Sequence, residues 1–292
     1  MNFERWLSKN TSSLSGKTVA ITGSTGGLGK ELCRFIAALG AELILVDRSK
    51  ARSEAFRDEL IADFGARVRC IGADLEDMDS VYSATERLIS EPIDVFIHNA
   101  GAYSIPRKIC KTGYDNVFQI NFISPYYIIK SLLPKLRERR GRAVVVGSIA
   151  HSYSKTDPGD IDFKTRKRAS LVYGNAKRYL MYALHELFKN ETEAALAVTH
   201  PGISFTGITA HYPKLIFALI KHPMKIIFMK PKKACLSILK GIYASTPAYS
   251  WIGPRFFGVW GLPRIFSLRS AKDAEIERIF VAAESIYCGI RK

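Results

Sequence analysis

The sequence predicts an α/β protein with a doubly wound parallel sheet, folded as a single domain. Over the first two thirds of its 292 residues, short β-branched runs alternate with longer runs of helical periodicity. This alternation is typical of a parallel sheet that helices cover on both faces. A glycine-rich stretch at 22–29 joins the first predicted strand to the first predicted helix of the series. In such folds ligands bind at the carboxyl ends of the strands, so the loops there are the candidates for chemistry.

The predicted elements follow one another without an internal repeat or a linker. Strands are predicted at 18–22, 42–46, 67–72, 93–97, 143–146 and 196–199, and a short run at 249–252 closes the sheet. Helices are predicted at 27–39, 49–64, 77–89, 116–137 and 168–189. Gly40 and Gly65 stand where the first two helices should end. Pro125 and Pro134 complicate the ends of the fourth.

Cysteine usage and the N-terminus indicate the compartment. The five cysteines are scattered, with no CxxC pair and no metal-ligand spacing, which favours a reducing environment and predicts no metal site. The first ten residues lack the apolar core of a signal peptide. No apolar run is long enough to span a bilayer. We therefore expect a cytoplasmic protein with, at most, peripheral contact with a membrane.

Charge separates the last third of the chain from the rest. The chain has 43 Lys and Arg against 27 Asp and Glu, a net charge of +16, which favours attraction to polyanions or acidic lipid surfaces. Ten of the basic residues and no acid lie between 205 and 270. We predict that 1–206 is the dinucleotide-binding and catalytic core, and that 207–270 is a basic, apolar extension over the substrate site. Two short amphipathic helices split by Pro223 are expected there, and 211–233 is the candidate for docking on a membrane.

The glycine-rich stretch predicts a dinucleotide site. Gly23, Gly27 and Gly29 lie between a strand and a helix, where glycine lets the backbone approach a pyrophosphate and the helix N-terminus favours its charge. Asp47 follows the second strand, where an acid can bond the ribose hydroxyls of the adenosine. A carboxylate there repels a 2′-phosphate, so NAD is favoured over NADP. Arg48, next in the chain, could stack on adenine or pair with that phosphate instead.

Tyr173 and Lys177 are the candidate proton-transfer pair. Four residues separate them within the helical run at 168–189, which places both on one face, one turn apart. That face continues into apolar positions, so the two polar groups should point to the interior. A cation held there is expected to lower the pKa of the tyrosine, so that it can act as a general acid and base.

Taken in order, these motifs resemble the short-chain dehydrogenase/reductase family, and the likeness covers roughly 14–206. The loop at 22–29 fits T-G-x-x-x-G-x-G, and Tyr173 to Lys177 fits Y-x-x-x-K. The turn at 98–101 fits N-N-A-G, except that His98 replaces the first Asn. The resemblance implies a Rossmann-like fold and assigns cofactor contacts to Gly23, Ser24, Thr25, Gly27, Leu28, Gly29, Asp47, Arg48, Asp74, Leu75, Asn99, Ala100, Gly101, Tyr173, Lys177, Pro201, Gly202, Ile203, Ser204 and Thr206.

The resemblance also implies the reaction. Ser148, Asn121, Tyr173 and Lys177 match the family's catalytic residues, and the expected activity is NAD(P)-dependent hydride transfer between an alcohol and its aldehyde or ketone. Ser-Ile-Ala-His at 148–151 and the insertion at 152–170 are similar to the retinol-dehydrogenase-like branch, which implies a small lipophilic substrate of retinoid, steroid or long-chain type. His151 is expected to be a loop hydrogen-bonding residue and not the base. Relatives commonly form homodimers through the long helices near Asn121 and Tyr173.

Two other classes of function stay open at this point. One is a non-catalytic nucleotide-binding sensor on the same scaffold, which the intact set of four catalytic residues disfavours. The other is a binder of membrane surfaces or nucleic acid through the basic extension. Bulky aliphatic residues alternate with the lysines of that extension, which suits an anionic bilayer better than nucleic acid.

Overall fold

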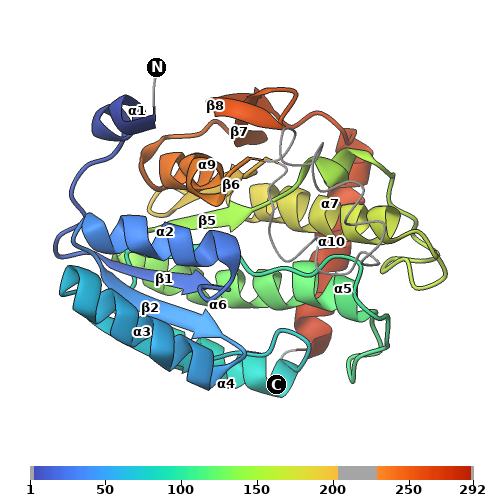
Figure 1. The fold of residues 1–292 in the computed structure, drawn as a ribbon. Coiled ribbons are helices and arrows are strands. Elements are labelled where there is room, and N and C mark those ends of the chain that lie inside the picture. The colour runs from blue at the N-terminus through green and yellow to red at the C-terminus, as the bar shows by residue number, and fades with distance from the viewer. Residues whose placement is uncertain (1–2, 203–228, 291–292) are drawn as a thin grey trace, which may run out of the picture.

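The sheet is doubly wound, as predicted. In this computed structural model, residues 3–202 and 229–290 are described, and they contain an eight-stranded sheet of order β3-β2-β1-β4-β5-β6-β7-β8 (Figure 1). The strands are β1 (Thr18–Thr22), β2 (Glu42–Asp47), β3 (Val68–Gly72), β4 (Val95–His98), β5 (Arg142–Val146), β6 (Ala195–Thr199), β7 (Ser250–Phe256) and β8 (Trp260–Ser267). Neighbouring strands from β3 to β7 pair in parallel, and β8 returns antiparallel to β7.

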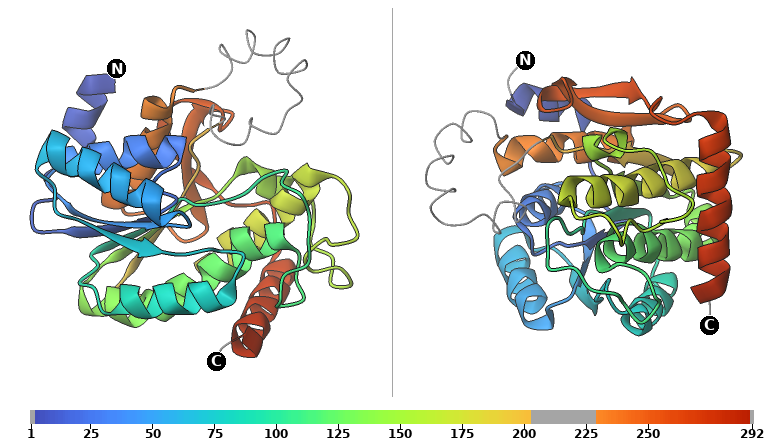
Figure 2. Two further views of the ribbon diagram at one scale, coloured as in Figure 1. Left: turned by 60° about the horizontal axis from the view of Figure 1, so that its bottom comes forward. Right: turned by 90° about the vertical axis from the view of Figure 1, so that its right-hand side faces the viewer.

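Helices cover both faces of this sheet (Figures 1 and 2). The described helices are α1 (Phe3–Asn10), α2 (Gly27–Ala38), α3 (Lys50–Phe64), α4 (Met78–Ile89), α5 (Asn116–Phe118), the π-helical turn η1 (Gln119–Ile123), α6 (Ser124–Glu138), the 3-10 turn η2 (Ile149–Ser152), α7 (Ala169–Leu187), α9 (Pro231–Tyr243) and α10 (Asp273–Ile290). Alternate residues of one strand face opposite layers: Val19 and Ile21 of β1 pack with α2 and α9, whereas Ala20 packs with the layer of α4, α6 and α7.

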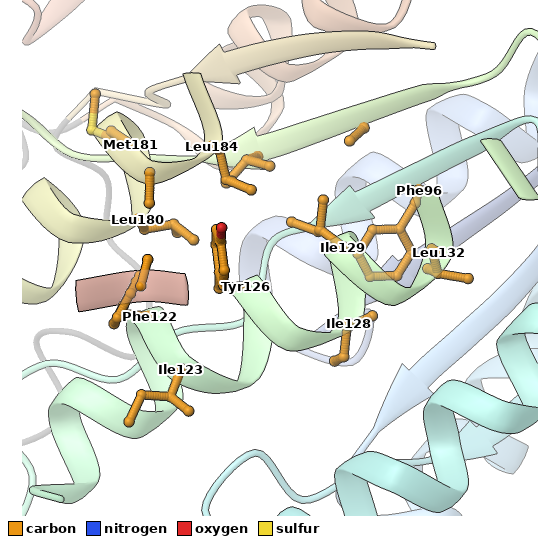
Figure 3. Close-up of a cluster of buried hydrophobic side chains, with 14 of the residues drawn as sticks. Phe96, Phe122, Ile123, Tyr126, Ile128, Ile129, Leu132, Leu180, Met181 and Leu184 are labelled. Atoms are coloured by element: carbon orange, nitrogen blue, oxygen red, sulfur yellow. The ribbon is translucent and has the colours of Figure 1, made fainter. Parts of the chain in front are cut away.

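The larger core lies behind the predicted catalytic helix. Phe122, Tyr126 and Ile129 come from η1 and α6, and they face Leu180 and Leu184 of α7 (Figure 3). All five are buried. This packing fixes the position of α7 relative to α6, and therefore the positions of the polar groups that the two helices carry at their other faces.

Most predicted boundaries agree with the structure, with two differences. The fourth strand was expected from 93 and begins at Val95, because Ile93 still belongs to the turn after α4, where its N–H donates to Glu91 O at 2.9 Å. The helix expected at 116–137 is divided into α5, η1 and α6. The short run expected to close the sheet is part of β7.

The last third contains elements that the sequence did not predict. β8 and α10 had no predicted counterpart, and neither had α1. Within the predicted extension, 203–228 lie outside the described residues, whereas α9, which was not predicted either, packs beside α2 against the sheet as part of the core. Among the described residues, no helix is long and apolar enough to cross a membrane, and no cluster of His, Cys, Asp and Glu could hold a metal. α10 lies across α6 and α7 (Figure 1), so a dimer through those helices, which stays a prediction, would use the surface that α10 leaves open.

Candidate active site

The glycine loop has the shape that a close approach of backbone requires. Gly23 has a φ of 67°, and its N–H donates to Val46 O at 2.9 Å. A Cβ on Gly29 would lie 2.1 Å from Gly23 O, so only glycine allows α2 to turn back against the loop. A Cβ on Gly27 would meet nothing within 4 Å, and no side chain of the described residues caps the start of α2. The first turn of α2 therefore has both open space and free N–H groups, which is what a pyrophosphate needs.

The turn after β4 fastens this loop to the sheet. The Asn99 side chain donates to Thr22 O at 3.1 Å and to Gly23 O at 3.0 Å. The Thr22 hydroxyl accepts the N–H groups of Asn99 and Ala100, and it bonds the His98 ring at 3.1 Å. His98, which stands where the family's motif has an asparagine, therefore takes part in this link. Its burial lowers its pKa well below the usual value, with the nearby Lys177 adding to the effect.

Asp47 lies at the glycine loop, but its carboxylate is already engaged. It is buried, and its oxygens accept the hydroxyls of Ser24 and Thr25 and the backbone N–H of Thr25. Ser53 adds a longer contact of 3.4 Å. Arg48, by contrast, is exposed. Asp47 therefore has a role that the sequence did not predict, because it holds the glycine loop in shape from the end of β2.

The second predicted pair of cofactor contacts lies after β3. Asp74 accepts the N–H of Glu76 at 3.0 Å, and its own N–H donates to the Ser80 hydroxyl at 2.9 Å. The carbonyl of Leu75 accepts the Ser124 hydroxyl at 2.7 Å. These bonds order the loop with backbone and side-chain groups from three segments, and they place it at the same edge of the sheet as Asp47.

Ser148 and Tyr173 meet where β5 ends. Ser148 begins η2, and its hydroxyl accepts the N–H of Ala150 at 3.2 Å. The same side chain lies close enough to Tyr173 to lower the pKa of the tyrosine. A Cβ on Gly174 would lie 2.4 Å from Ala150 O, so the glycine beside Tyr173 is what lets α7 press against η2. The two hydroxyls that the sequence predicted to act on one substrate oxygen are therefore adjacent.

Lys177 lies beneath this pair. Its Nζ donates to Val146 O at 2.9 Å and lies 5.7 Å from the centre of the Tyr173 ring. Burial lowers the pKa of Lys177 to about 7. The prediction that this cation lowers the pKa of Tyr173 is wrong for the structure, because burial raises that pKa to about 12, although the Ser148 side chain opposes the rise. The groups that set the pKa of Tyr173 are its burial, the Ser148 side chain and the nearby Tyr103, and the charge of Lys177 is not among them.

Asn121 joins the group through a local break in helical geometry. It lies in η1, where its side-chain amide donates to Val117 O and Ala102 O, each at 2.8 Å. A Cβ on Gly101 would lie 2.8 Å from Asn121 Oδ1 and 3.6 Å from Lys177 Nζ, so both groups converge beside Gly101. Single π-helical turns are frequent at functional sites, and here the turn places Asn121 on the same side of Gly101 as Lys177.

The remaining predicted contacts are only partly described. Pro201 and Gly202 follow β6, and Gly202 has a φ of 83° and lies against Val259 and Met229. Ile203, Ser204 and Thr206 lie outside the described residues. The structure adds Tyr103, whose ring meets Tyr173 edge to face at 5.3 Å. Its position two residues after the glycine of the 98–101 turn was the only signal in the sequence that could have identified it.

Comparison with known proteins agrees with this geometry. A family model described as short chain dehydrogenase matches residues 17–157. The chain belongs to the short-chain dehydrogenase family. As a member of this family it is an oxidoreductase, and a nicotinamide cofactor is supported. The matched segment contains the glycine loop, Asp47, Asn121 and Ser148, and it ends before Tyr173.

Relatives of this short-chain dehydrogenase include retinol dehydrogenases. Mouse retinol dehydrogenase 12 is 30% identical over 202 residues, which cover 67% of this chain and 64% of the relative. Human retinol dehydrogenase 14 is 27% identical over 267 residues, covering 84% and 79%. An uncharacterized oxidoreductase of Schizosaccharomyces pombe is 26% identical over 263 residues, covering 84% and 77%. Among solved structures, an uncharacterized protein of Mycobacterium paratuberculosis is similar in fold, with a TM-score of 0.77, 23% identity and 96% of both chains covered.

Proposed function

We propose that this enzyme interconverts a lipophilic alcohol and its aldehyde or ketone, with Tyr173 as general acid and base. The observation that carries the proposal is that the side chains of Ser148 and Lys177 both lie beside Tyr173. A nicotinamide cofactor, when bound, supplies or accepts the hydride. The protein then has to orient one substrate oxygen and move one proton to or from it.

Each residue of the group has a separate part in that proton movement. Ser148, fixed at the start of η2, would hydrogen-bond the substrate oxygen and set its direction. Tyr173 would take the hydroxyl proton during oxidation and return it to the carbonyl oxygen during reduction. Lys177 and Asn121 meet beside Gly101, so they would carry the proton onward from Tyr173 and hold the ribose of the nicotinamide.

The apolar surroundings of the site favour a lipophilic substrate. The ring of Tyr103 stands against Tyr173 at 5.3 Å. Ile149 follows Ser148 and lies beside Trp251, since a Cβ on Gly258 would lie within 3.1 Å of both. The retinol dehydrogenases among the relatives are named for a lipophilic alcohol. Together these features support a retinoid-, steroid- or long-chain-like substrate.

Replacement of Tyr173 by Phe tests the catalytic assignment. We expect Tyr173→Phe to lower turnover of a lipophilic alcohol by about a thousandfold, because the proton has no acceptor. The affinity for NADH or NADPH, measured by fluorescence titration, should stay unchanged, because the Tyr173 ring and its packing remain. Tyr153→Phe is the matched control, since Tyr153 is half exposed in the turn after η2 and should keep full activity. An active Tyr173→Phe enzyme would rule out this role, and a wild-type protein that binds the cofactor but oxidises no alcohol would favour a sensor.

We further propose NAD as the preferred cofactor. The negative charge of Asp47 lies at the tip of β2, and it opposes a ribose 2′-phosphate even though its oxygens already accept Ser24 and Thr25. NADH should bind about tenfold more tightly than NADPH, since like charges brought together weaken binding. Asp47→Asn should narrow this ratio, and Arg48→Gln should leave NADH binding unchanged. Tighter binding of NADPH to the wild type, lost in Arg48→Gln, would reverse the assignment.

A further inference from the structure

The turn between β7 and β8 exposes three aromatic rings within five residues. The exposed fraction is 50% for Phe256, 88% for Phe257 and 46% for Trp260. Single exposed apolar side chains are common on soluble proteins, whereas large rings gathered at one tip mark an interaction surface. We call Phe256, Phe257 and Trp260 the aromatic tip.

The backbone conformation at the aromatic tip is unfavourable for a phenylalanine. Phe257 has a φ of 53°, in the left-handed region. Bulky side chains rarely adopt that conformation, and glycine and asparagine are the residues that fit such turns. The ring of Phe257 does not compensate by packing, because it is nearly fully exposed. A phenylalanine at this position is therefore better explained by contact with something outside the chain.

The inner side of the hairpin is fixed to the active site. A Cβ on Gly258 would lie 3.0 Å from Ile149 and 3.1 Å from Trp251. The Trp251 ring stacks on Phe266 of β8 with centroids 5.1 Å apart. Ile149 follows Ser148, so the aromatic tip is held directly against the turn that carries the catalytic serine.

A groove with positive charge lies along the same hairpin. It runs between α1, α9 and β7–β8, elements that adjoin in Figures 1 and 2. Its charged lining residues are Lys240, Arg255 and Arg264, and none of the described residues that line it is acidic. Arg255 lies 5.7 Å from the ring of Phe256, so the groove and the aromatic tip are continuous. We call these three cations the basic groove.

We propose that the aromatic tip and the basic groove dock the protein on an anionic phospholipid membrane. Aromatic rings favour the boundary between headgroups and acyl chains, and Lys and Arg beside them bind the lipid phosphates. The exposed rings therefore match the apolar boundary of the membrane, and the cations, with no acid beside them in the groove, match its negative charge. Docking there would bring the Ser148 turn to the membrane, where lipophilic molecules are dissolved. The proposal does not depend on the catalytic assignment, because binding is measured without turnover.

Sedimentation with vesicles tests the proposal on the full chain. The wild type should bind vesicles of phosphatidylcholine mixed with phosphatidylserine, and bind vesicles of phosphatidylcholine alone much more weakly. Phe257→Asn should lower the partition coefficient by about tenfold, because one large apolar side chain no longer enters the interface. Asparagine suits the left-handed backbone, so the variant should unfold at the same temperature as the wild type or higher. Arg255→Gln and Arg264→Gln should each lower the partition coefficient by about fivefold.

Matched variants away from the hairpin separate docking from non-specific adsorption to vesicles. Phe64 on α3 is also exposed, and Arg140 is exposed between α6 and β5. Phe64→Asn and Arg140→Gln should keep wild-type partitioning. The proposal is overturned if the wild type does not bind the anionic vesicles, if Phe257→Asn binds them as well as the wild type does, or if Phe64→Asn loses as much. Equal binding to vesicles with and without phosphatidylserine would contradict the part of the proposal in which the basic groove binds anionic lipid.

Discussion

Two neighbouring residues on α7 show how differently one helix treats a buried positive charge. Lys177 faces the active site and Arg178 faces the C-terminal helix α10, and both side chains are almost completely buried. Arg178 donates two hydrogen bonds to the Glu275 carboxylate, at 2.7 and 2.8 Å, and three more to His151 and Ser270. Lys177 has one hydrogen bond to a described residue, the carbonyl of Val146.

The difference shows what each face is for. The guanidinium of Arg178 is paired with a carboxylate, and each of its nitrogens donates a hydrogen bond. This face of α7 therefore holds the helix, the η2 turn and α10 together. Although burial opposes it, the bonds from Arg178 and Thr156 lower the pKa of Glu275. Lys177 has no carboxylate partner among the described residues, and its lowered pKa reflects the free-energy cost of burying an ammonium group. Unpaired buried charges reduce stability and are tolerated where function needs them.

Removal of Arg178 should produce the largest change in stability. Arg178→Met leaves the Glu275 carboxylate buried without its cation, and this should lower the free energy of unfolding by about 3–5 kcal/mol. Urea denaturation at neutral pH measures the loss. The double variant Arg178→Met/Glu275→Met removes both charges and should recover most of it. If Arg178→Met unfolds at the same urea concentration as the wild type, then the two faces of α7 do not differ as described.

The sheet could be predicted from the sequence because its signals are local. Strand β1, the glycine loop and α2 follow one another within about two dozen residues, and each β-branched run needs only its own pattern to be recognised. β8 could not be predicted in this way, because it is a strand through its pairing with β7. α10 was missed although it carries a local signal, since its buried residues Ile276, Ile279, Ala283 and Ile286 recur at helical spacing. Its ion pair with α7, between Arg178 and Glu275, joins residues 97 positions apart and could not be predicted from periodicity.

The active site was predicted as a set of residues but not in its electrostatics. The structure brings Ser148, Tyr173, Lys177 and Asn121 together, as their motifs indicated. The pKa of Tyr173 was expected to fall and is instead raised, because burial depends on the whole fold around the hydroxyl. The bonds from Ser24 and Thr25 to Asp47 were likewise missed, since they depend on how the glycine loop closes over the end of β2.

A smaller effect, opposite in sign, is expected on the other face of α7. The folded protein holds the pKa of Lys177 at about 7, well below the value of roughly 10.4 for an unfolded chain. Between these values the unfolded chain binds more protons, so this lysine makes stability rise with pH across that range. Below about pH 7 both states are protonated, and the cost of the buried charge is present in full.

Lys177→Met removes that cost together with one hydrogen bond to Val146. The variant should therefore be inactive but more stable than the wild type at pH 6 by on the order of 1–3 kcal/mol. The gain should shrink as the pH is raised toward 10, because the wild-type lysine is then neutral when folded. Urea denaturation at pH 6 and pH 9 measures both values. A variant that is less stable at pH 6 would mean that the ammonium group is as well satisfied in the fold as the guanidinium of Arg178, and the contrast between the two faces would then lie in their partners alone.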